Sequence, residues 1–141
     1  MEKRILCVDD EQAIVMVMQN LLRMGGYLPR CTLDPREALE IVKSEGVRVC
    51  IVDLRMPAMH GMDLCREIKR IQPGALVFAL SAFVDAYSPK EYREAGFEGT
   101  FHKPFKIDEI LDACRAAFEK LERLDAEQAA KPGPAPGSKA T

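Results

Sequence analysis

Residues 47–53, Val-Arg-Val-Cys-Ile-Val-Asp, end a short apolar run with an acidic side chain. The run is continuous, rich in β-branched residues and too short for a typical helix. These features are typical of a strand buried on both faces of a parallel sheet. Two further stretches also read clearly as strands, 5–8 and 75–80. Two others, 27–31 and 97–101, are weaker candidates. Pro29 predicts a sheet-edge position for its strand, because proline cannot donate to a central ladder.

Segments with helical spacing separate these strand candidates. Apolar side chains recur at intervals of three and four residues in 14–22, 38–42, 62–71 and 107–121. The run Ser88-Pro89-Lys90-Glu91 reads as a capping box that opens a shorter helix ending near Ala95. Strand and helix therefore alternate five times, which predicts an α/β fold with a five-stranded parallel sheet covered on both faces.

Composition excludes several classes of protein. Apolar residues make up 48% of the 141 residues and charged residues 30%, which argues against a disordered or membrane-embedded chain. Lys and Arg number 20 against 22 Asp and Glu, so no broad nucleic-acid surface is expected. The apolar runs are too short to span a bilayer, and the first residues do not form a secretory signal. Five cysteines without Cys-x-x-Cys spacing favour reduced thiols in a cytoplasmic protein over a zinc site.

The end of the chain differs in composition from the rest. From about residue 126 aromatic and β-branched residues disappear until the last position, and 131–138 is rich in Pro and Gly. The sequence therefore predicts one domain over 1–124 and a flexible tail or linker over 125–141.

Polar side chains follow four of the five predicted strands. Asp9-Asp10 follows the first strand, Asp53 the third, Ser81 the fourth and Lys103 the fifth. In an open parallel sheet, ligands bind beyond the carboxyl ends of the strands, so we expect these groups to share one edge.

Three carboxylates brought together need a compensating charge. Like charges raise one another's pKa, and Mg²⁺ (or Mn²⁺) would relieve the repulsion because it prefers oxygen ligands. Asp53 would then be able to attack phosphorus, with Lys103 and Ser81 binding the phosphoryl oxygens. The set suits reversible phosphoryl transfer to an aspartate.

Each of these residues also has an ordinary structural explanation when taken alone. Asp9-Asp10 can cap a helix, Asp53 can be a turn residue, Ser81 can lie in a loop and Lys103 can be solvated. The joint arrangement at four strand ends favours the functional interpretation.

The sequence resembles the receiver domain of bacterial two-component response regulators, over residues 4 to about 123. The stretches that carry the resemblance are Ile5-Leu6-Cys7-Val8-Asp9-Asp10-Glu11, Val52-Asp53-Leu54-Arg55-Met56-Pro57-Ala58-Met59-His60-Gly61, Leu80-Ser81-Ala82 and His102-Lys103-Pro104-Phe105. Asp-x-x-Met-Pro-x-Met-x-Gly is highly specific, whereas the other stretches gain weight from their order and spacing. The resemblance implies a flavodoxin-like (βα)5 three-layer sandwich with strand order 2-1-3-4-5.

The resemblance also implies roles for the site residues. Asp53 matches the phospho-accepting aspartate, and Ser81 and Lys103 match the groups that bind the phosphoryl group. Asp10 matches a direct Mg²⁺ ligand, and Asp9 a ligand bound directly or through water. Arg55 lies where the family donates a backbone carbonyl to the metal. Lys103-Pro104 matches a peptide bond that is usually cis.

The implied partners are a sensor histidine kinase or a phosphotransfer protein, and a downstream protein or missing output domain. Phosphorylation would shift the surface of the fourth helix, fifth strand and fifth helix. The chain is expected to be a monomer or a phosphorylation-dependent dimer. Its only chemistry would be self-phosphorylation and self-dephosphorylation, without activity as an enzyme on another substrate.

Three departures from the family pattern stand out. Thr100 lies where the family often has an aromatic residue that responds to phosphorylation, and neither Tyr87 nor Phe101 occupies that position. Pro89 predicts a late start of the fourth helix at Ser88 after a long loop from Ser81. Phe83, like Arg55, flanks the phosphoryl site, where its ring would shield an acyl phosphate from water.

Three other functions are alternatives. A receiver-like module that binds partners without phosphorylation is compatible with Thr100 and the altered fourth helix. An aspartyl phosphatase would need a general acid two residues after Asp53, where Arg55 lies instead. A flavin-binding domain would need a phosphate-binding loop after the first strand, where the sequence has acids.

Overall fold

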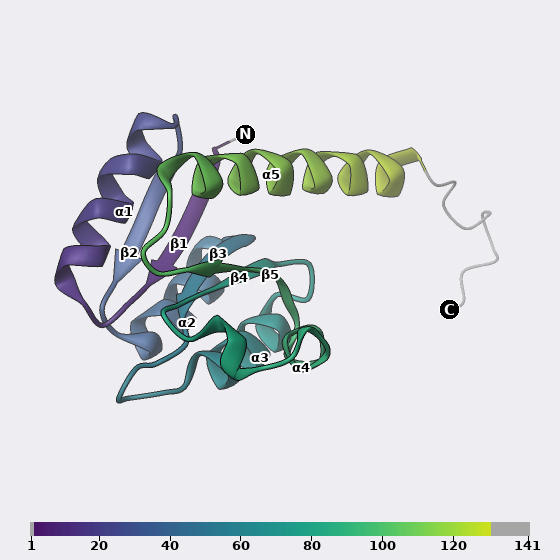
Figure 1. Cartoon of the computed structure of the whole chain (residues 1–141). Helices are drawn as coiled ribbons and strands as arrows, with labels where there is room; N and C mark the ends of the chain where they lie inside the picture. Colours follow the sequence, from purple (N-terminus) through teal and green to yellow (C-terminus); the bar gives the residue numbers. More distant parts are fainter. Residues whose placement is uncertain (1, 131–141) are drawn as a thin grey trace.

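The computed structural model describes residues 2–130, which form alternating strands and helices (Figure 1). The elements in chain order are β1 (Arg4–Val8), α1 (Gln12–Met24), β2 (Leu28–Thr32), α2 (Pro35–Glu45), β3 (Val49–Asp53), α3 (Gly61–Ile71), β4 (Leu76–Ser81), the short 3₁₀ helix η1 (Val84–Ala86), α4 (Pro89–Ala95), β5 (Phe97–His102) and α5 (Ile107–Ala130). Within this range no helix is both long enough and apolar enough to cross a bilayer.

The strands form one parallel sheet in the order β2-β1-β3-β4-β5, which confirms the predicted flavodoxin-like fold. Residues 49–53 of β3 are buried throughout, as their continuous apolar run predicts. Pro29 lies in the edge strand β2. Among the described residues no further strand pairs with the outer side of β2, so the N–H that proline lacks is not needed there.

Helices cover both faces of the sheet. On one face, α2, α3 and α4 pack over a core that includes Leu6, Val52 and Ile68. On the other face, α1 and α5 pack over a second core that includes Ile51 and Ile110. Successive residues of β3 therefore serve opposite cores, because side chains alternate across a strand.

The fourth helix begins late, as Pro89 predicts. Ser88 is the N-cap: its side chain accepts a hydrogen bond from the Glu91 amide at 3.1 Å, and Glu91 accepts one from the Ser88 amide at 2.9 Å. The loop before the helix runs from Ser81 and contains η1.

Ser88→Ala is expected to lower the free energy of unfolding by about 1 kcal/mol, because the mutation leaves a helix-end amide without its cap. Urea denaturation followed by circular dichroism measures the change. Ser44→Ala is the matched control, since Ser44 is exposed and bonds only to Glu40 of its own helix. Equal losses in the two variants would contradict the capping role.

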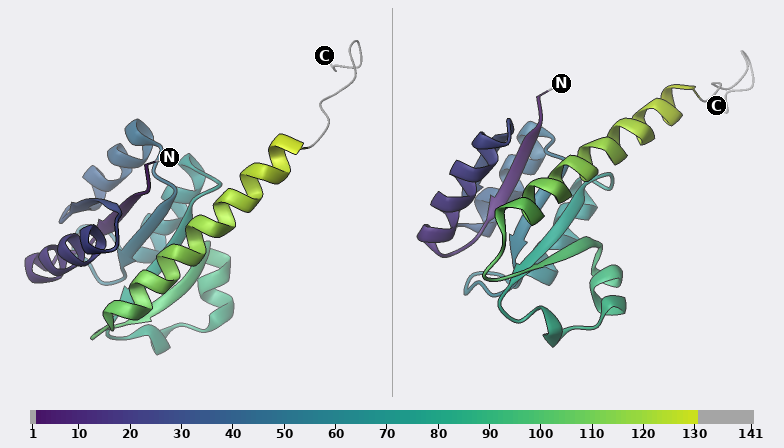
Figure 2. Two further views of the ribbon diagram at one scale, coloured as in Figure 1. Left: turned by 90° about the horizontal axis from the view of Figure 1, so that it is seen from above. Right: turned by 45° about the horizontal axis from the view of Figure 1, so that its top comes forward.

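The last helix extends past the predicted domain boundary. Residues 125–130 are helical, and Figure 2 shows α5 projecting beyond the sheet. Arg48 fixes the projecting part with two hydrogen bonds of 2.9 Å to Asp125. The rest of the predicted tail, 131–141, lies outside the described residues.

Candidate functional site

The parallel strands bring the predicted site residues to one edge of the sheet. Asp9 follows β1, Asp53 ends β3, Ser81 ends β4 and Lys103 follows β5. Lys103 Nζ lies 2.9 Å from Asp9 and 3.4 Å from Asp53, although these residues are far apart in the sequence.

Three carboxylates form the centre of the site. One oxygen each from Asp9, Asp10 and Asp53 lie within 4.8 Å of one another; Asp9 and Asp53 are buried and Asp10 is exposed. Burial raises the pKa of Asp53 to about 7, and the charge of Asp9 adds to this effect while Lys103 opposes it. Burial likewise raises the pKa of Asp9. Keeping both Asp9 and Asp53 ionised therefore requires more positive charge.

Lys103 supplies one positive charge to this cluster. Its ammonium group contacts Asp9 and Glu11, both at 2.9 Å, and more distantly Asp53. Burial by itself would lower the pKa of Lys103, but its ion pairs with Asp9 and Glu11 raise it overall, so the side chain stays charged. The Lys103-Pro104 peptide bond is cis, as the resemblance implies.

The residues present fit a hard divalent cation. Asp9 Oδ1 accepts a hydrogen bond from the Glu11 amide at 2.9 Å. Asp9 Oδ2 is buried and accepts no hydrogen bond, although Lys103 Nζ lies nearby as an ion-pair partner without hydrogen-bond geometry. A buried carboxylate oxygen that is paired with the Lys103 ammonium but accepts no hydrogen bond, beside two further carboxylates, matches the oxygen ligands of Mg²⁺. The cluster is thus one that can bind a metal.

A small pocket of about 100 Å³ opens above Asp53 and Lys103. Ser81 lines it, and its Oγ accepts a hydrogen bond from the Phe83 amide at 2.9 Å, which leaves the hydroxyl hydrogen available to donate. At the rim, the Arg55 guanidinium stacks 4.2 Å from the centre of the Phe83 ring. The Arg55 side chain thus faces Phe83.

The loop after β3 returns tightly to the strand end. The Gly61 amide donates a hydrogen bond of 2.8 Å to the Leu54 carbonyl. A Cβ at Gly61 would clash with the Asp53 carbonyl oxygen and lie 2.7 Å from Leu54 Cα. Only glycine fits here, because α3 begins directly against the backbone that carries Asp53.

Sequence reasoning missed two features of the site region. Glu11 contacts Lys103, and its only signal was its position directly after Asp9-Asp10. His60 caps α3 through Nδ1, which accepts from the Met62 amide at 3.1 Å, and its Nε2 lies 3.0 Å from the Tyr87 hydroxyl. No local pattern predicts that second contact, since it joins two separate loops.

The structure places the aromatic residues near Thr100 on different faces. Phe101 points into the opposite core and stacks on Phe78, with ring centres 5.4 Å apart. Tyr87 instead lines a hollow of about 340 Å³ between α4 and β5, together with Tyr92 and Thr100. Of Tyr87 and Phe101, Tyr87 is therefore the one on the Thr100 side of the strand.

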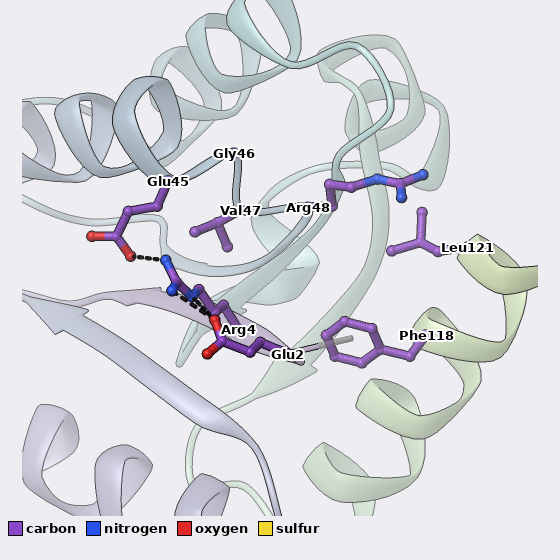
Figure 3. A pocket seen from close by; sticks show the side chains of 8 residues that line it. All are labelled: Glu2, Arg4, Glu45, Gly46, Val47, Arg48, Phe118 and Leu121. Atoms are coloured by element: carbon purple, nitrogen blue, oxygen red, sulfur yellow. Dashed lines mark hydrogen bonds and ion pairs between the residues drawn. The ribbon is translucent and has the colours of Figure 1, made fainter. Parts of the chain in front are cut away.

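A second cavity, of about 410 Å³, lies at the opposite, amino-terminal ends of the strands (Figure 3). Phe118 and Leu121 of α5 form its apolar wall. Arg4 in this cavity already bonds to Glu45 at 3.1 Å and to Glu2 at 2.7 Å. The charged side chains named here are thus already engaged in ion pairs, Glu45 with Arg30 as well, which leaves the carboxylate edge as the chemical centre of the domain.

Comparison with known proteins agrees with this geometry. The family model of the response regulator receiver domain matches residues 5–115. The chain therefore belongs to the receiver-domain family of two-component response regulators, as the sequence motifs suggest.

Several of its curated relatives are bacterial. Sporulation initiation phosphotransferase F of Bacillus subtilis (strain 168) is 30% identical over 115 residues, covering 82% of this chain and 93% of the relative. Response regulator MprA of Mycobacterium ulcerans (strain Agy99) is 29% identical over 129 residues, covering 92% of this chain but 56% of the relative. The chain thus spans little more than half the length of the MprA relatives.

Solved structures confirm the fold. A response regulator receiver domain protein from Clostridium thermocellum superposes with a TM-score of 0.80 at 28% identity, covering 86% of this chain and 98% of the other. A receiver domain described as BeF3-activated DrrB gives a TM-score of 0.76 at 26% identity, with coverage of 84% and 99%.

Proposed function

We propose that the chain is a Mg²⁺-dependent phosphoacceptor switch in which Asp53 receives a phosphoryl group from a histidine kinase or phosphotransfer protein. The observation that carries this proposal is the juxtaposition of Asp53 with Asp9 and Lys103 at one edge of the sheet. The described cysteines are free thiols, which suits a reducing compartment and therefore a cytoplasmic location.

The chemistry follows from the side chains around Asp53. A carboxylate oxygen of Asp53 attacks phosphorus as the donor's P–O or P–N bond breaks, which leaves an acyl phosphate on the protein. Lys103 then pairs with a phosphoryl oxygen, and the Ser81 hydroxyl donates to another. Bound Mg²⁺ would neutralise charge between the carboxylates and the phosphoryl oxygens. Asp9, Asp10, Asp53 and the Arg55 carbonyl are the groups that would hold it.

Output would pass through the surface of α4, β5 and α5. The hollow lined by Tyr87, Tyr92 and Thr100 lies on this surface, and the loop from Ser81 leads into it. Phosphorylation would change the population of loop states, and a partner protein or a further domain would read the change. The phosphorylated form would act as a monomer or dimerise.

Thr100 favours a second candidate, a receiver-like module that binds its partner without phosphorylation. Thr100 is exposed and has no aromatic ring to bury on activation. In this case the same α4–β5 surface would bind its partner protein equally well before and after treatment with a phosphodonor. A phosphorylation switch would bind the partner differently in the two states, which distinguishes the two candidates.

Incubation with acetyl phosphate tests the proposal. In the presence of Mg²⁺, intact-protein mass spectrometry is expected to show one added phosphoryl group, and Mn²⁺ should substitute. Excess EDTA should abolish the addition, because the carboxylates then lose their compensating charge. Failure to modify the folded protein with either acetyl phosphate or a competent histidine kinase would favour the phosphorylation-independent module.

Phe83→Ala is expected to shorten the lifetime of the phosphorylated form severalfold. The ring is 53% exposed and stacks on Arg55 at the pocket rim, so its removal opens a path for water toward Asp53. The decay of the phosphorylated mass after removal of the donor measures the lifetime. Leu124→Ala is the control, because Leu124 is a similarly exposed apolar residue far along α5. An unchanged decay rate in Phe83→Ala would exclude the shielding role.

A further inference from the structure

Two cysteines lie side by side on neighbouring strands. Cys7 of β1 is paired in register with Cys31 of the parallel strand β2. Residues paired in this way point to the same face of the sheet, and both cysteines indeed pack with the core under α1 and α5. The interstrand spacing of about 4.8 Å falls within the Cα separation that a disulfide accepts.

The two thiols differ in access. Cys7 is fully buried, whereas Cys31 lies on the edge strand, is partly exposed and lines a hollow of about 360 Å³. Gln12 and Val15 of α1 form one side of this hollow, and Asp34 and Glu37 another. A small reagent can therefore reach Cys31 from solvent, with Cys7 directly behind it.

The surroundings of Cys31 also favour its thiolate, which is the reactive form of a cysteine. The neighbouring Cys7 thiol lowers the pKa of Cys31; partial burial opposes this effect, and the charges of Arg23 and Arg30 support it. By contrast, burial raises the pKa of Cys65 and of Cys114 to about 12. Cys50 is fully buried as well. Since the thiolate is the nucleophile, Cys31 is the cysteine suited to react first.

We propose that Cys31 is an oxidation site for hydroperoxides, with Cys7 as the resolving thiol that closes a reversible Cys7–Cys31 disulfide. The Cys31 thiolate attacks the peroxide, so an S–O bond forms, the O–O bond breaks and the alkoxide or hydroxide leaves and takes up a proton. Cys7 then loses its proton and attacks the Cys31 sulfur, which forms the S–S bond and releases water. Two thiols are oxidised by two electrons, and the hydroperoxide is reduced to an alcohol (or water) and water.

Treatment of the reduced chain with hydrogen peroxide, followed by alkylation of the remaining thiols, tests this proposal. Non-reducing peptide mapping is expected to show the peptides of Cys7 and Cys31 joined, with the loss of two hydrogen atoms from the intact mass. Dithiothreitol should restore both thiols.

Variants separate the two roles. Cys31→Ala should lose the cross-link and leave Cys7 unreacted, whereas Cys7→Ala should stop at a Cys31 sulfenic acid that dimedone traps. Cys114→Ala, a buried cysteine on the same face, should form the disulfide as the parent does. Circular dichroism checks that each variant is folded. Oxidation that begins at another cysteine, or that joins two chains through Cys31 while Cys7 stays free, would overturn the proposal.

Discussion

Asp53→Asn is expected to abolish phosphoryl incorporation from acetyl phosphate completely. Asparagine keeps the shape of the side chain but its amide oxygen cannot form an acyl phosphate, so the nucleophile is lost while the packing is kept. Intact-protein mass spectrometry in Mg²⁺ measures the result. Asp63→Asn is the matched control, because Asp63 is an exposed carboxylate in the first turn of α3 and should leave incorporation unchanged. Incorporation into Asp53→Asn at the parent's rate would contradict the assignment.

Stability provides an independent readout of the same variant. The pKa of Asp53 is raised by burial to about 7 from a usual 3.8, so the folded protein binds a proton more tightly than the unfolded chain. In metal-free buffer the contribution of Asp53 to stability therefore falls as the pH rises between about 4 and 7. Asp53→Asn should flatten this pH dependence and should not lower the urea midpoint at neutral pH. A large loss of stability would show that absent phosphorylation reflects misfolding.

Gly61→Ala is expected to destabilise the fold by about 3 kcal/mol and to slow phosphorylation. The added methyl group would clash with the Asp53 carbonyl oxygen and with Leu54 Cα, and neither backbone atom can move without displacing the strand end. Since the clash falls on the backbone of Asp53, the rate of phosphorylation should fall together with the free energy of unfolding. Urea denaturation and the rate of phosphoryl incorporation measure the two effects.

Gly74→Ala is the control for this substitution. A Cβ at Gly74 would meet no atom within 4 Å, so the free energy of unfolding should change by less than about 0.5 kcal/mol. If the two alanine variants were equally stable, the tight return of the loop onto β3 would not be a structural requirement.

Local sequence patterns predicted most of the fold. The apolar runs predicted the strands because both faces of the sheet are covered, and Pro29 marked the edge strand correctly. The capping box at Ser88 and Pro89 placed the start of α4. The length of α5 was less predictable, since Leu124 is the only large apolar side chain in residues 122–130 and the Arg48–Asp125 contact joins distant parts of the chain.

The site was predictable where topology alone brings residues together. Asp9, Asp53, Ser81 and Lys103 each follow a strand, and a parallel sheet must place them at one edge. Contacts between loops were not predictable, because their geometry depends on tertiary packing. The His60–Tyr87 hydrogen bond and the Arg55–Phe83 stack are of this kind.

Chemical mapping of the modified residue tests the central claim most directly. After reaction with acetyl phosphate and Mg²⁺, borohydride reduces an acyl phosphate to an alcohol and so converts the modified aspartate to homoserine. Peptide mass spectrometry then locates the change. We expect homoserine at residue 53 alone, in proportion to the phosphoryl group first incorporated. Reduction at Asp9, Asp10 or Glu11 instead, or no homoserine in a protein that carries the phosphoryl group, would contradict the account.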